Sequence, residues 1–391
     1  QDIDDALHVS LIGGGVVEVG VHIADVTHFV AEGSVLDFEA AKRGTTTYLT
    51  QNVTSCCRRP TRPPRQAIPM LPPILSEQLC SLLPNVDRLA FSVIFKMTMD
   101  GALLEEAPFF GRTVIRSKAR LDYATAQRII DGVIDLDNPA TLTEETWETA
   151  RRSQDKALMS AVVMSVKLLD SVARRRREKR FASGALCLNN TKLCFDLWRT
   201  KSGGGVEPRS CHASAISEAN NLIEEYMLTA NFLVAQKILT SGAGDFALLR
   251  RQPEPVTKGL SDLKDLLASR GMELDISSSL AFHKSLSRIR KGDPLISKAS
   301  CFPLLQMLAT APMKVAEYFA AGLEEPSAWR HYALAMPAYT HFTSPIRRYA
   351  DCCVHRLLTR ALRNGAATAV EVRKLKQLAE HLNERRMAAQ A

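Results

Sequence analysis

The first five residues carry side chains that could do metal-assisted chemistry. Asp2, Asp4 and Asp5 place three carboxylates within four positions. Their mutual repulsion is unfavourable, and a hard divalent cation is the usual ligand that offsets it. A short acidic segment is also common as a solvated strand start in which an aspartate caps a turn, so the three residues alone leave both interpretations open.

A second polar cluster lies between residues 339 and 351. Ser344 followed by Pro345 predicts the start of a helix, with Ser344 as N-cap and the proline in the first helical position. The apolar spacing continues this helix to about Arg363, and Asn364 with Gly365 ends it.

Two arginines fall in the first turn of that predicted helix. Arg347 and Arg348 would be disfavoured there by the helix dipole, and a bound anion would reverse the penalty. Free backbone N–H groups, the hydroxyls of Thr343 and Ser344 and two guanidiniums would then form a phosphate pocket. The alternative is that Arg347 pairs with Asp351, four residues later; the dipole argument favours the pocket.

Alternating and apolar segments predict the elements that position these clusters. Around the glycines at 13–15 and around Asp100 and Gly101, the pattern predicts two β-hairpins. In an extended chain Asp2 and Asp4 would share a face and Asp5 would point the other way. The predicted strands cover 6–12, 16–24, 45–49, 89–97, a partner strand ending near 116, and a pair within 185–197 around 189–190.

Helical spacing accounts for most of the remaining chain. The segment 217–239 is apolar almost all round, which is typical of a buried helix, so Glu218, Glu224 and Glu225 would need partners if they faced inward. The basic run at 174–180 is either a solvated helix end or a patch that follows phosphates. Helices are predicted at 36–43, 76–83 with Ser76 as N-cap, 121–134, 144–180, 217–239, most of 259–321 and 344–363.

Composition restricts the class of partner. The 391 residues are 46% hydrophobic and 24% charged, as in ordinary globular proteins, and 50 basic against 42 acidic residues give a net charge of +8. A positive balance suits an anionic partner, and no apolar run of about 18 residues suggests a membrane span. Nine cysteines without CxxC spacing indicate reduced thiols rather than a zinc site. The arginine- and proline-rich loop 54–67 either contacts RNA phosphates or is a tolerated insertion.

Taken together, these segments resemble the RNB domain, the catalytic domain of ribonuclease II, ribonuclease R and the eukaryotic exosome-type nucleases. The matching pieces occur in family order over nearly the whole chain, which makes the set far more specific than any single piece. Residues 19–37 and 80–95 are most similar to the cytoplasmic Dis-three-like branch. The pieces are QDIDDALH, GVHIADVTHFV, IPMLPPILSEQLCSL, RLAFSVIF, GRTVIRSKARLDY, SGALCL, LIEEYMLTAN, LLRRQPEP and YTHFTSPIRRYADCCVHRLL.

The resemblance implies an α+β fold: a single RNB catalytic domain over residues 1–391, with a mixed or antiparallel sheet flanked by helices around a deep RNA channel. It also implies that the N-terminal edge of the domain is truncated and that flanking cold-shock and S1 β-barrel domains are absent. A monomer in the cytoplasm is expected, with the nucleus as second location. The expected partners are single-stranded RNA 3′ ends and exosome or decay factors, without a membrane.

The activity implied is that of a phosphodiester hydrolase, a magnesium-dependent 3′-to-5′ exoribonuclease that degrades single-stranded RNA processively to 5′-mononucleotides, with Mn²⁺ as a substitute ion. Four family aspartates gather around the metal. Asp2, Asp4 and Asp5 match the last three, and the first would lie before Gln1. Asp4 matches the acid with the sharpest catalytic role, and Arg347 matches the arginine that contacts the scissile phosphate.

Further positions match family residues that contact RNA. Tyr48 matches an aromatic residue near the terminal base, and Tyr123 one that contacts the RNA. Glu224 or Glu225 matches a glutamate that contacts the ribose, with no basis for a choice. The sequence departs from the family pattern at Gln252, where many relatives have histidine, and at the insertion 56–65. The expected RNA-binding set is Tyr48, Tyr123, Glu224, Glu225, Arg250, Arg251, Thr343, Ser344 and Arg348.

Three other functions are compatible with parts of the pattern. One is an RNB-fold module that binds RNA with little or no activity; the acids and Arg347 argue against it. The others are an endonucleolytic or DNA-acting phosphodiesterase and an assembly scaffold that uses the basic loop.

Overall fold

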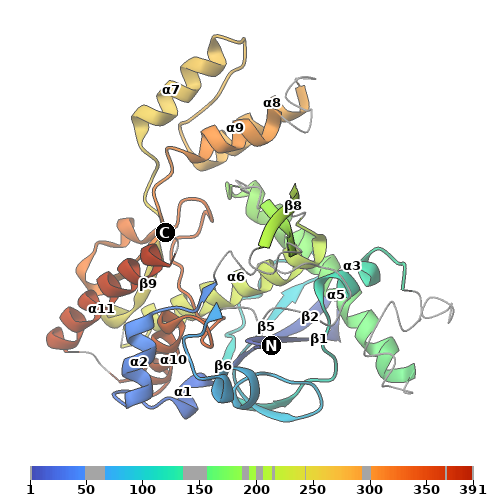
Figure 1. Cartoon of the computed structure of the whole chain (residues 1–391), viewed down its shortest axis with the longest axis vertical. Coiled ribbons are helices and arrows are strands. Elements are labelled where there is room, and N and C mark those ends of the chain that lie inside the picture. Colours follow the sequence, from blue (N-terminus) through green and yellow to red (C-terminus); the bar gives the residue numbers. More distant parts are fainter. Residues whose placement is uncertain are drawn as a thin grey trace.

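The computed structural model describes residues 2–48, 67–134, 156–186, 193–199, 206–213, 216–242, 244–292, 301–365 and 368–389. One antiparallel sheet dominates the first 116 residues (Figure 1). Both predicted hairpins are confirmed in it. Its strands run in the order β1 (Asp5–Gly13), β2 (Val16–Ala24), β5 (Asp87–Thr98) and β6 (Phe109–Arg116).

Strand β2 lies between β1 and β5 and is buried on both faces. Val19, Val21 and Ile23 are inaccessible to solvent, and His22 between them is covered as well. Burial of each such aliphatic side chain contributes about 1.5–3 kcal/mol, which makes β2 the fixed centre of the sheet. The N–H of Ala24 at its end donates to the carbonyl oxygen of Asp4 over 2.8 Å, so the buried strand also fixes the backbone of the acidic segment.

The helices predicted at 36–43, 121–134, 144–180 and 217–239 are present as α2, α3, α5 and α6, although α3 is shorter and residues 135–155 lie outside the described ranges. Helix α6 is buried along most of its length, as its apolar pattern predicts.

The elements outside the sheet are α1 (Val26–Phe29), α2 (Val35–Arg43), β3 (Thr47–Tyr48), β4 (Ala67–Ile68), η2 (Ile74–Leu79), α3 (Tyr123–Ile130), α5 (Lys156–Ala182), β7 (Leu193–Arg199), β8 (Val206–Ala213), α6 (Glu218–Leu239), η4 (Gly244–Phe246), β9 (Leu248–Arg251), α7 (Thr257–Ala268), α8 (Ser279–Gly292), α9 (Cys301–Thr310), β10 (Glu317–Ala320), η5 (Ala321–Leu323), η6 (Pro326–Trp329), α10 (Tyr349–Leu362) and α11 (Ala369–Ala388).

The basic run at the end of α5 joins that helix to its neighbours. Arg176 donates to the Thr229 hydroxyl on α6 over 2.6 Å and to the Gly101 carbonyl in the β5–β6 turn, while Lys179 pairs with Asp100. Gly101 has φ +79°, and a Cβ there would lie 2.6 Å from the backbone nitrogen of Arg176. Both interpretations of the run are therefore wrong for Arg176, which holds the hairpin and two helices together, while Lys179 stays exposed at the helix end as the solvated interpretation expects.

Helices α7, α8 and α9 form an arm that projects from the rest of the molecule (Figure 1). A second hydrophobic cluster includes Leu263, Phe282 and Leu305 of the arm, together with Leu186 and Tyr332 from outside it. Strands β9 and β10 flank the arm in sequence and pair antiparallel, so the two ends of the arm return to the same place in the main body.

One local prediction is wrong. Residues 76–83 do not form an α-helix with Ser76 as N-cap; instead η2 is a π-helix that begins after Pro73. The centre of the predicted strand pair, at 189–190, lies outside the described residues; within them β7 pairs with β8. The insertion 56–65 also lies outside the described ranges.

The α+β class with one antiparallel main sheet is confirmed, while the deep RNA channel stays a prediction. In the part of the chain that the structure describes, no helix has both the length and the apolar run that crossing a bilayer requires.

A chain of hydrogen bonds crosses the sheet and predicts a pH dependence of stability. His8 Nδ1 lies 2.7 Å from His22 Nε2, and His22 Nδ1 lies 2.7 Å from the Ser92 hydroxyl. Burial, helped by the charge of His8, lowers the pKa of His22 to about 4. Between the unfolded pKa of about 6.5 and this value, only the unfolded chain takes up the proton, so the free energy of unfolding should fall as pH decreases, by up to about 1.4 kcal/mol per pH unit.

Urea unfolding of the parent, His22→Gln and His28→Gln at several pH values between 7 and 4 measures this slope. His22→Gln should show a smaller decrease in stability than the parent over this window. The exposed His28 is the matched control, and its variant should keep the slope of the parent. An unchanged slope in His22→Gln would refute the assignment.

Candidate active site

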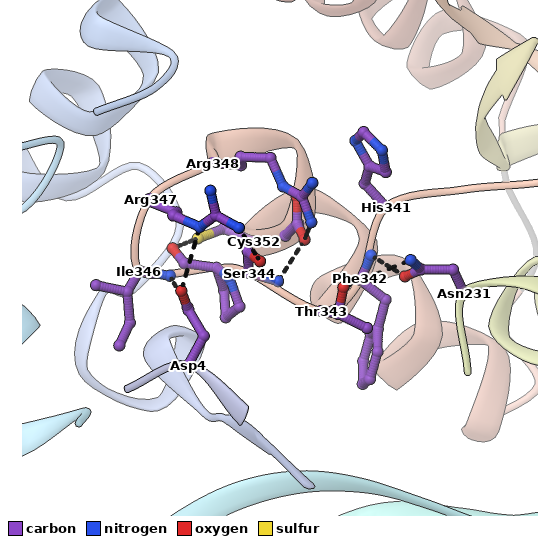
Figure 2. Close-up of polar contacts among 12 residues, drawn as sticks. Asp4, Asn231, His341, Phe342, Thr343, Ser344, Ile346, Arg347, Arg348 and Cys352 are labelled. Atoms are coloured by element: carbon purple, nitrogen blue, oxygen red, sulfur yellow. Dashed lines mark hydrogen bonds and ion pairs between the residues drawn. The ribbon is translucent and has the colours of Figure 1, made fainter. Parts of the chain in front are cut away.

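The two polar clusters, more than 330 residues apart in sequence, meet in space. Asp4 lies immediately before β1, and its Oδ1 accepts a hydrogen bond from the backbone N–H of Ile346 over 2.9 Å. Its Oδ2 lies 3.6 Å from Nε of Arg347 (Figure 2). The Asp4 side chain is 8% exposed and that of Arg347 is 46% exposed, so a buried acid supports a guanidinium that solvent can reach.

The segment 342–348 is held from two sides. Asp351, fully buried in the first turn of α10, accepts the N–H of Ser344 over 2.7 Å and a guanidinium N–H of Arg348 over 2.8 Å. From α6, Asn231 accepts the N–H of Phe342 over 2.8 Å (Figure 2). The backbone that presents Ile346 and Arg347 to Asp4 is therefore fixed by two buried side chains.

The helix predicted from Ser344 begins later. Helix α10 starts at Tyr349, and Arg348, with φ −135° and ψ 121°, is its N-cap residue. Arg347 and Arg348 thus precede the helix, so the dipole argument for a pocket at its first turn is wrong. The alternative pairing is wrong as well, because Asp351 binds Arg348, three residues earlier, while Arg347 faces Asp4.

The acids differ in environment. Burial raises the pKa of Asp4 to about 7, although the Ile346 N–H and Arg347 act in the opposite direction. Burial also raises the pKa of Asp5, again against the effect of Arg347. Asp2 is exposed, so the predicted common face of Asp2 and Asp4 is wrong; β1 begins only at Asp5, and the strand alternation does not extend to Asp2.

Asp4 and Asp5 fit a divalent cation. Two desolvated carboxylates whose pKa values are raised lack sufficient positive charge, and a hard cation would supply it. Among the described residues no group of three or more acids, histidines or cysteines is assembled. Mg²⁺ is commonly held by one or two carboxylates together with water and substrate phosphates, so a pair of acids is a sufficient protein contribution.

The two tyrosines flank this cluster in different ways. Tyr123, half exposed at the start of α3, has its pKa raised by burial and then by the charge of Asp5, while Arg347 lowers it, which places the phenol within electrostatic reach of both. Tyr48 is exposed on β3, two residues after Thr46, whose N–H donates to the carbonyl of Arg347 over 3.0 Å.

The structure separates the two neighbouring glutamates on α6. Glu225 is 1% exposed and forms a two-pronged pair with Arg180, whose Nε lies 3.1 and 3.2 Å from its two carboxylate oxygens. Glu224 is 51% exposed, with Arg180 at 3.7 Å. Glu225 thus neutralises an arginine of α5 in the interior, and Glu224 is the one whose carboxylate faces solvent.

The other predicted RNA contacts are distributed unevenly. Thr343 and Ser344 are buried beside the cluster, and Arg348 binds Asp351. Arg251 is directed elsewhere, since Glu317 and Glu324 hold it at 2.8 and 3.1 Å. Arg250 lies behind the 342–348 segment, in a cavity described below.

Sequence reasoning missed two contributors to the site and gave a third the wrong partner. The backbone N–H of Ile346 has no side-chain signature at all. Asn231 looks like an ordinary helix residue, and the only signal for it is a polar side chain at an otherwise apolar helix position, where a buried partner is needed. The spacing offers Arg347 as the partner of Asp351, which binds Arg348 instead.

Known proteins resemble this chain over most of its length. A sequence model of the family described as "RNB domain" matches residues 1–364. The chain is 40% identical over 391 residues to DIS3-like exonuclease 2 of Schizosaccharomyces pombe. The alignment covers 99% of this chain and 38% of that protein. The chain is also 40% identical over 363 residues to a protein of Arabidopsis thaliana named "Inactive exonuclease DIS3L2", covering 92% of the chain and 31% of that protein.

Among solved structures, Mycoplasma genitalium RNase R in complex with ribose methylated single-stranded RNA superposes with a TM-score of 0.77 at 24% identity, over 99% of this chain and 53% of that one. This likeness shows the fold. The chain spans less than half the length of the two curated relatives.

The clamp on the 342–348 segment can be tested through stability. Asp351→Ala should lower the free energy of unfolding by about 3–5 kcal/mol, because it leaves the Arg348 guanidinium and the Ser344 N–H without their buried acceptor. Asp351→Asn keeps an acceptor for the N–H of Ser344 and should lose less. Urea unfolding at pH 7 measures both, and a loss below about 1 kcal/mol in the alanine variant would contradict the clamp.

Proposed function

The chain belongs to the RNB domain family, and on that premise we propose that it is a hydrolytic 3′-to-5′ exoribonuclease that degrades single-stranded RNA processively to 5′-mononucleotides. The observation that carries the proposal is the contact of Asp4 with Ile346 and Arg347. It brings a desolvated acid and an accessible guanidinium together, as phosphodiester hydrolysis requires. The names of the relatives and the RNA in the RNase R complex support RNA as the substrate class.

Metal binding belongs to the same proposal. Asp4 and Asp5, with the exposed Asp2 as a further acid, would hold Mg²⁺, or Mn²⁺ in its place. When bound, such an ion lowers the pKa of an attacking water and stabilises the leaving 3′ oxygen.

Arg347 would bind the scissile phosphate directly. Its guanidinium is accessible, and Asp4 at 3.6 Å together with the Ser344 hydroxyl at 3.2 Å orients it. A preorganised cation aimed at the non-bridging oxygens stabilises the charge that develops as the bond to the leaving oxygen breaks. Asp4 therefore has two roles, as a metal ligand and as the group that positions Arg347.

The accessible aromatic residues and Glu224 would hold the RNA end. Tyr123, beside Asp5 and Arg347, and Tyr48, beyond the Thr46 contact, can stack on bases without regard to their identity. Glu224 is our choice for the ribose contact, because Glu225 is enclosed with Arg180 whereas the Glu224 carboxylate is exposed to solvent and can accept a hydrogen bond from a 2′-hydroxyl.

The second candidate is an RNA-binding module with little or no activity. It is favoured by the name of the Arabidopsis relative, which is as similar to this chain as the relative named as an exonuclease. The presence of Asp2, Asp4, Asp5 and Arg347 supports catalysis instead.

Asp4→Asn should lower RNA hydrolysis by about a hundredfold or more while RNA affinity changes little, because one carboxylate serves both the metal and Arg347 whereas binding energy is spread along the phosphates. The assay follows a 5′-labelled single-stranded RNA with and without Mg²⁺, beside a DNA oligomer of the same sequence. Glu105→Gln, an acid-to-amide change at an exposed site, is the control. Equal turnover of the Asp4 variant and the parent would defeat the mechanism, and tight binding without any hydrolysis by the parent would favour the second candidate.

Glu224→Gln should reduce the preference for a 3′-terminal ribonucleotide over a 2′-deoxynucleotide by about tenfold, the value of one hydrogen bond to a charged group. Glu225→Gln should instead destabilise the fold, because it leaves Arg180 buried without its counter-charge, and should leave the preference unchanged. Competition between oligomers that differ only in the terminal 2′ position measures the ratio. The opposite pattern, with the preference lost only in the Glu225 variant, would reverse the assignment.

A further inference from the structure

A cavity of about 250 Å³ lies behind the segment that carries Arg347. Its wall includes three arginines from separate parts of the chain: Arg250 on β9, Arg348 before α10 and Arg386 on α11. Tyr318, His341 and Thr45 are the other polar side chains of the wall. Among the described residues that line it there is no acid, so the cavity is enriched in positive charge.

Arg250 is the most strongly buried of these arginines and lacks a counter-charge. It is 5% exposed, and among the described residues its Nη1 has no hydrogen-bond partner and no carboxylate forms an ion pair with it. Glu317, on the paired strand β10, binds Arg251 instead. The Arg250 guanidinium lies 4.8 Å from the centre of the Tyr318 ring, which compensates only part of the desolvation. A guanidinium cannot give up its proton in a protein, so an unsatisfied buried N–H of this kind requires an acceptor from elsewhere.

The neighbours of Arg250 add positive charge and no acceptor for it. Arg386 donates one N–H to the carbonyl of Ala316 over 2.6 Å, and none of the described carboxylates pairs with it. Nε of Arg348 is buried without a partner, although Asp351 binds the other end of that guanidinium. Burial is the main reason that the pKa of Arg250 is lowered, and the charges of Arg386 and Arg348 add to it.

His341 does not contribute another charge. Burial, followed by the nearby charges of Arg348 and Arg250, holds its pKa well below the ordinary range. Its Nδ1 lies 2.6 Å from the Tyr318 hydroxyl, so the two side chains satisfy each other on one side of the cavity. The positive charges available to a ligand are therefore those of the arginines.

The cavity is distinct from the candidate active site. None of Asp2, Asp4, Asp5 or Arg347 lines it. Arg348 has an extended backbone, so its side chain and that of Arg347 leave the segment in different directions. Figure 2 shows Arg347 beside Asp4 and Arg348 directed toward His341. Arg386 lies beyond residue 364, where the match to the family ends.

We propose that this cavity, here called the rear pocket (Arg250, Arg348, Arg386, Tyr318 and His341), binds a phosphate group at a site separate from the scissile phosphate. Planar guanidinium forks match the oxygens of phosphate in pairs, and three of them around one small cavity suit a multiply charged oxyanion. The inference rests on the proposed function only for the source of that group, which is either the RNA backbone or the 5′-monophosphate product.

Isothermal titration calorimetry on the Asp4→Asn protein tests the pocket without consuming RNA. The probes are inorganic phosphate, uridine 5′-monophosphate and a single-stranded oligouridylate, in chloride buffer of constant ionic strength. Arg386→Met, at the partly exposed rim, and Arg250→Met should each weaken phosphate-dependent binding by about tenfold or more, the scale of a lost charge-assisted hydrogen bond. Arg373→Met, an exposed arginine on the same helix α11, should have no effect.

The outcomes distinguish the RNA backbone from free phosphate esters as the ligand, and they test the pocket separately from the proposed function. A loss with inorganic phosphate and the mononucleotide supports the pocket as a site for free phosphate esters. A loss confined to the oligomer supports it as a site for the RNA backbone. Unchanged affinity for all three probes in Arg386→Met, with an intact thermal transition, overturns the proposal even if Arg250→Met fails to fold. Hydrolysis by the unmodified protein is assayed separately, so phosphate binding without hydrolysis would overturn the proposed function and leave the pocket standing.

Discussion

The hydrogen bond from the Ile346 N–H to the Asp4 carboxylate, with Arg347 on the other oxygen, is the interaction on which the rest of the site depends. It joins the start of the main sheet to the segment before α10. Burying a carboxylate costs free energy unless it accepts hydrogen bonds and has a counter-charge. Here the backbone N–H of Ile346 supplies a hydrogen bond and the Arg347 guanidinium supplies part of the counter-charge. The site is therefore assembled only when both ends of the chain are folded.

The charges around the 342–348 segment are divided by its backbone. On one side, Asp4 and Asp5 are desolvated and short of positive charge. On the other, Arg250, Arg348 and Arg386 surround a cavity with no acid in its described wall. A ligand of opposite charge would neutralise each side: a cation at Asp4 and Asp5, and a phosphate in the rear pocket. Because Arg347 and Arg348 are adjacent, occupation of one side can affect the geometry of the other only through the short, clamped backbone between them.

Buried ion pairs elsewhere have a structural role that their sequence context conceals. The basic run at the end of α5 looks like a solvated helix end, yet Arg180 is enclosed with Glu225, and Arg176 reaches α6 and the β5–β6 turn. These contacts fix α6, from which Asn231 holds the backbone of Phe342. The arginines of α5 thus support the active-site segment indirectly, because they position α6 and α6 holds that segment.

The sequence by itself determined the sheet hairpins, the buried character of α6 and the family, because alternation, helical spacing and collinear segments are local or additive signals. It also pointed to Asp4 and Arg347 as the residues of interest, although their roles stay predictions. Only the tertiary structure decided that α10 begins at Tyr349, that Asp351 binds Arg348, that Glu224 rather than Glu225 faces solvent, and that three distant arginines share a cavity. Each of these depends on which side chains become buried together when the chain folds. Burial and long-range pairing set that outcome, and neither has a period along the chain.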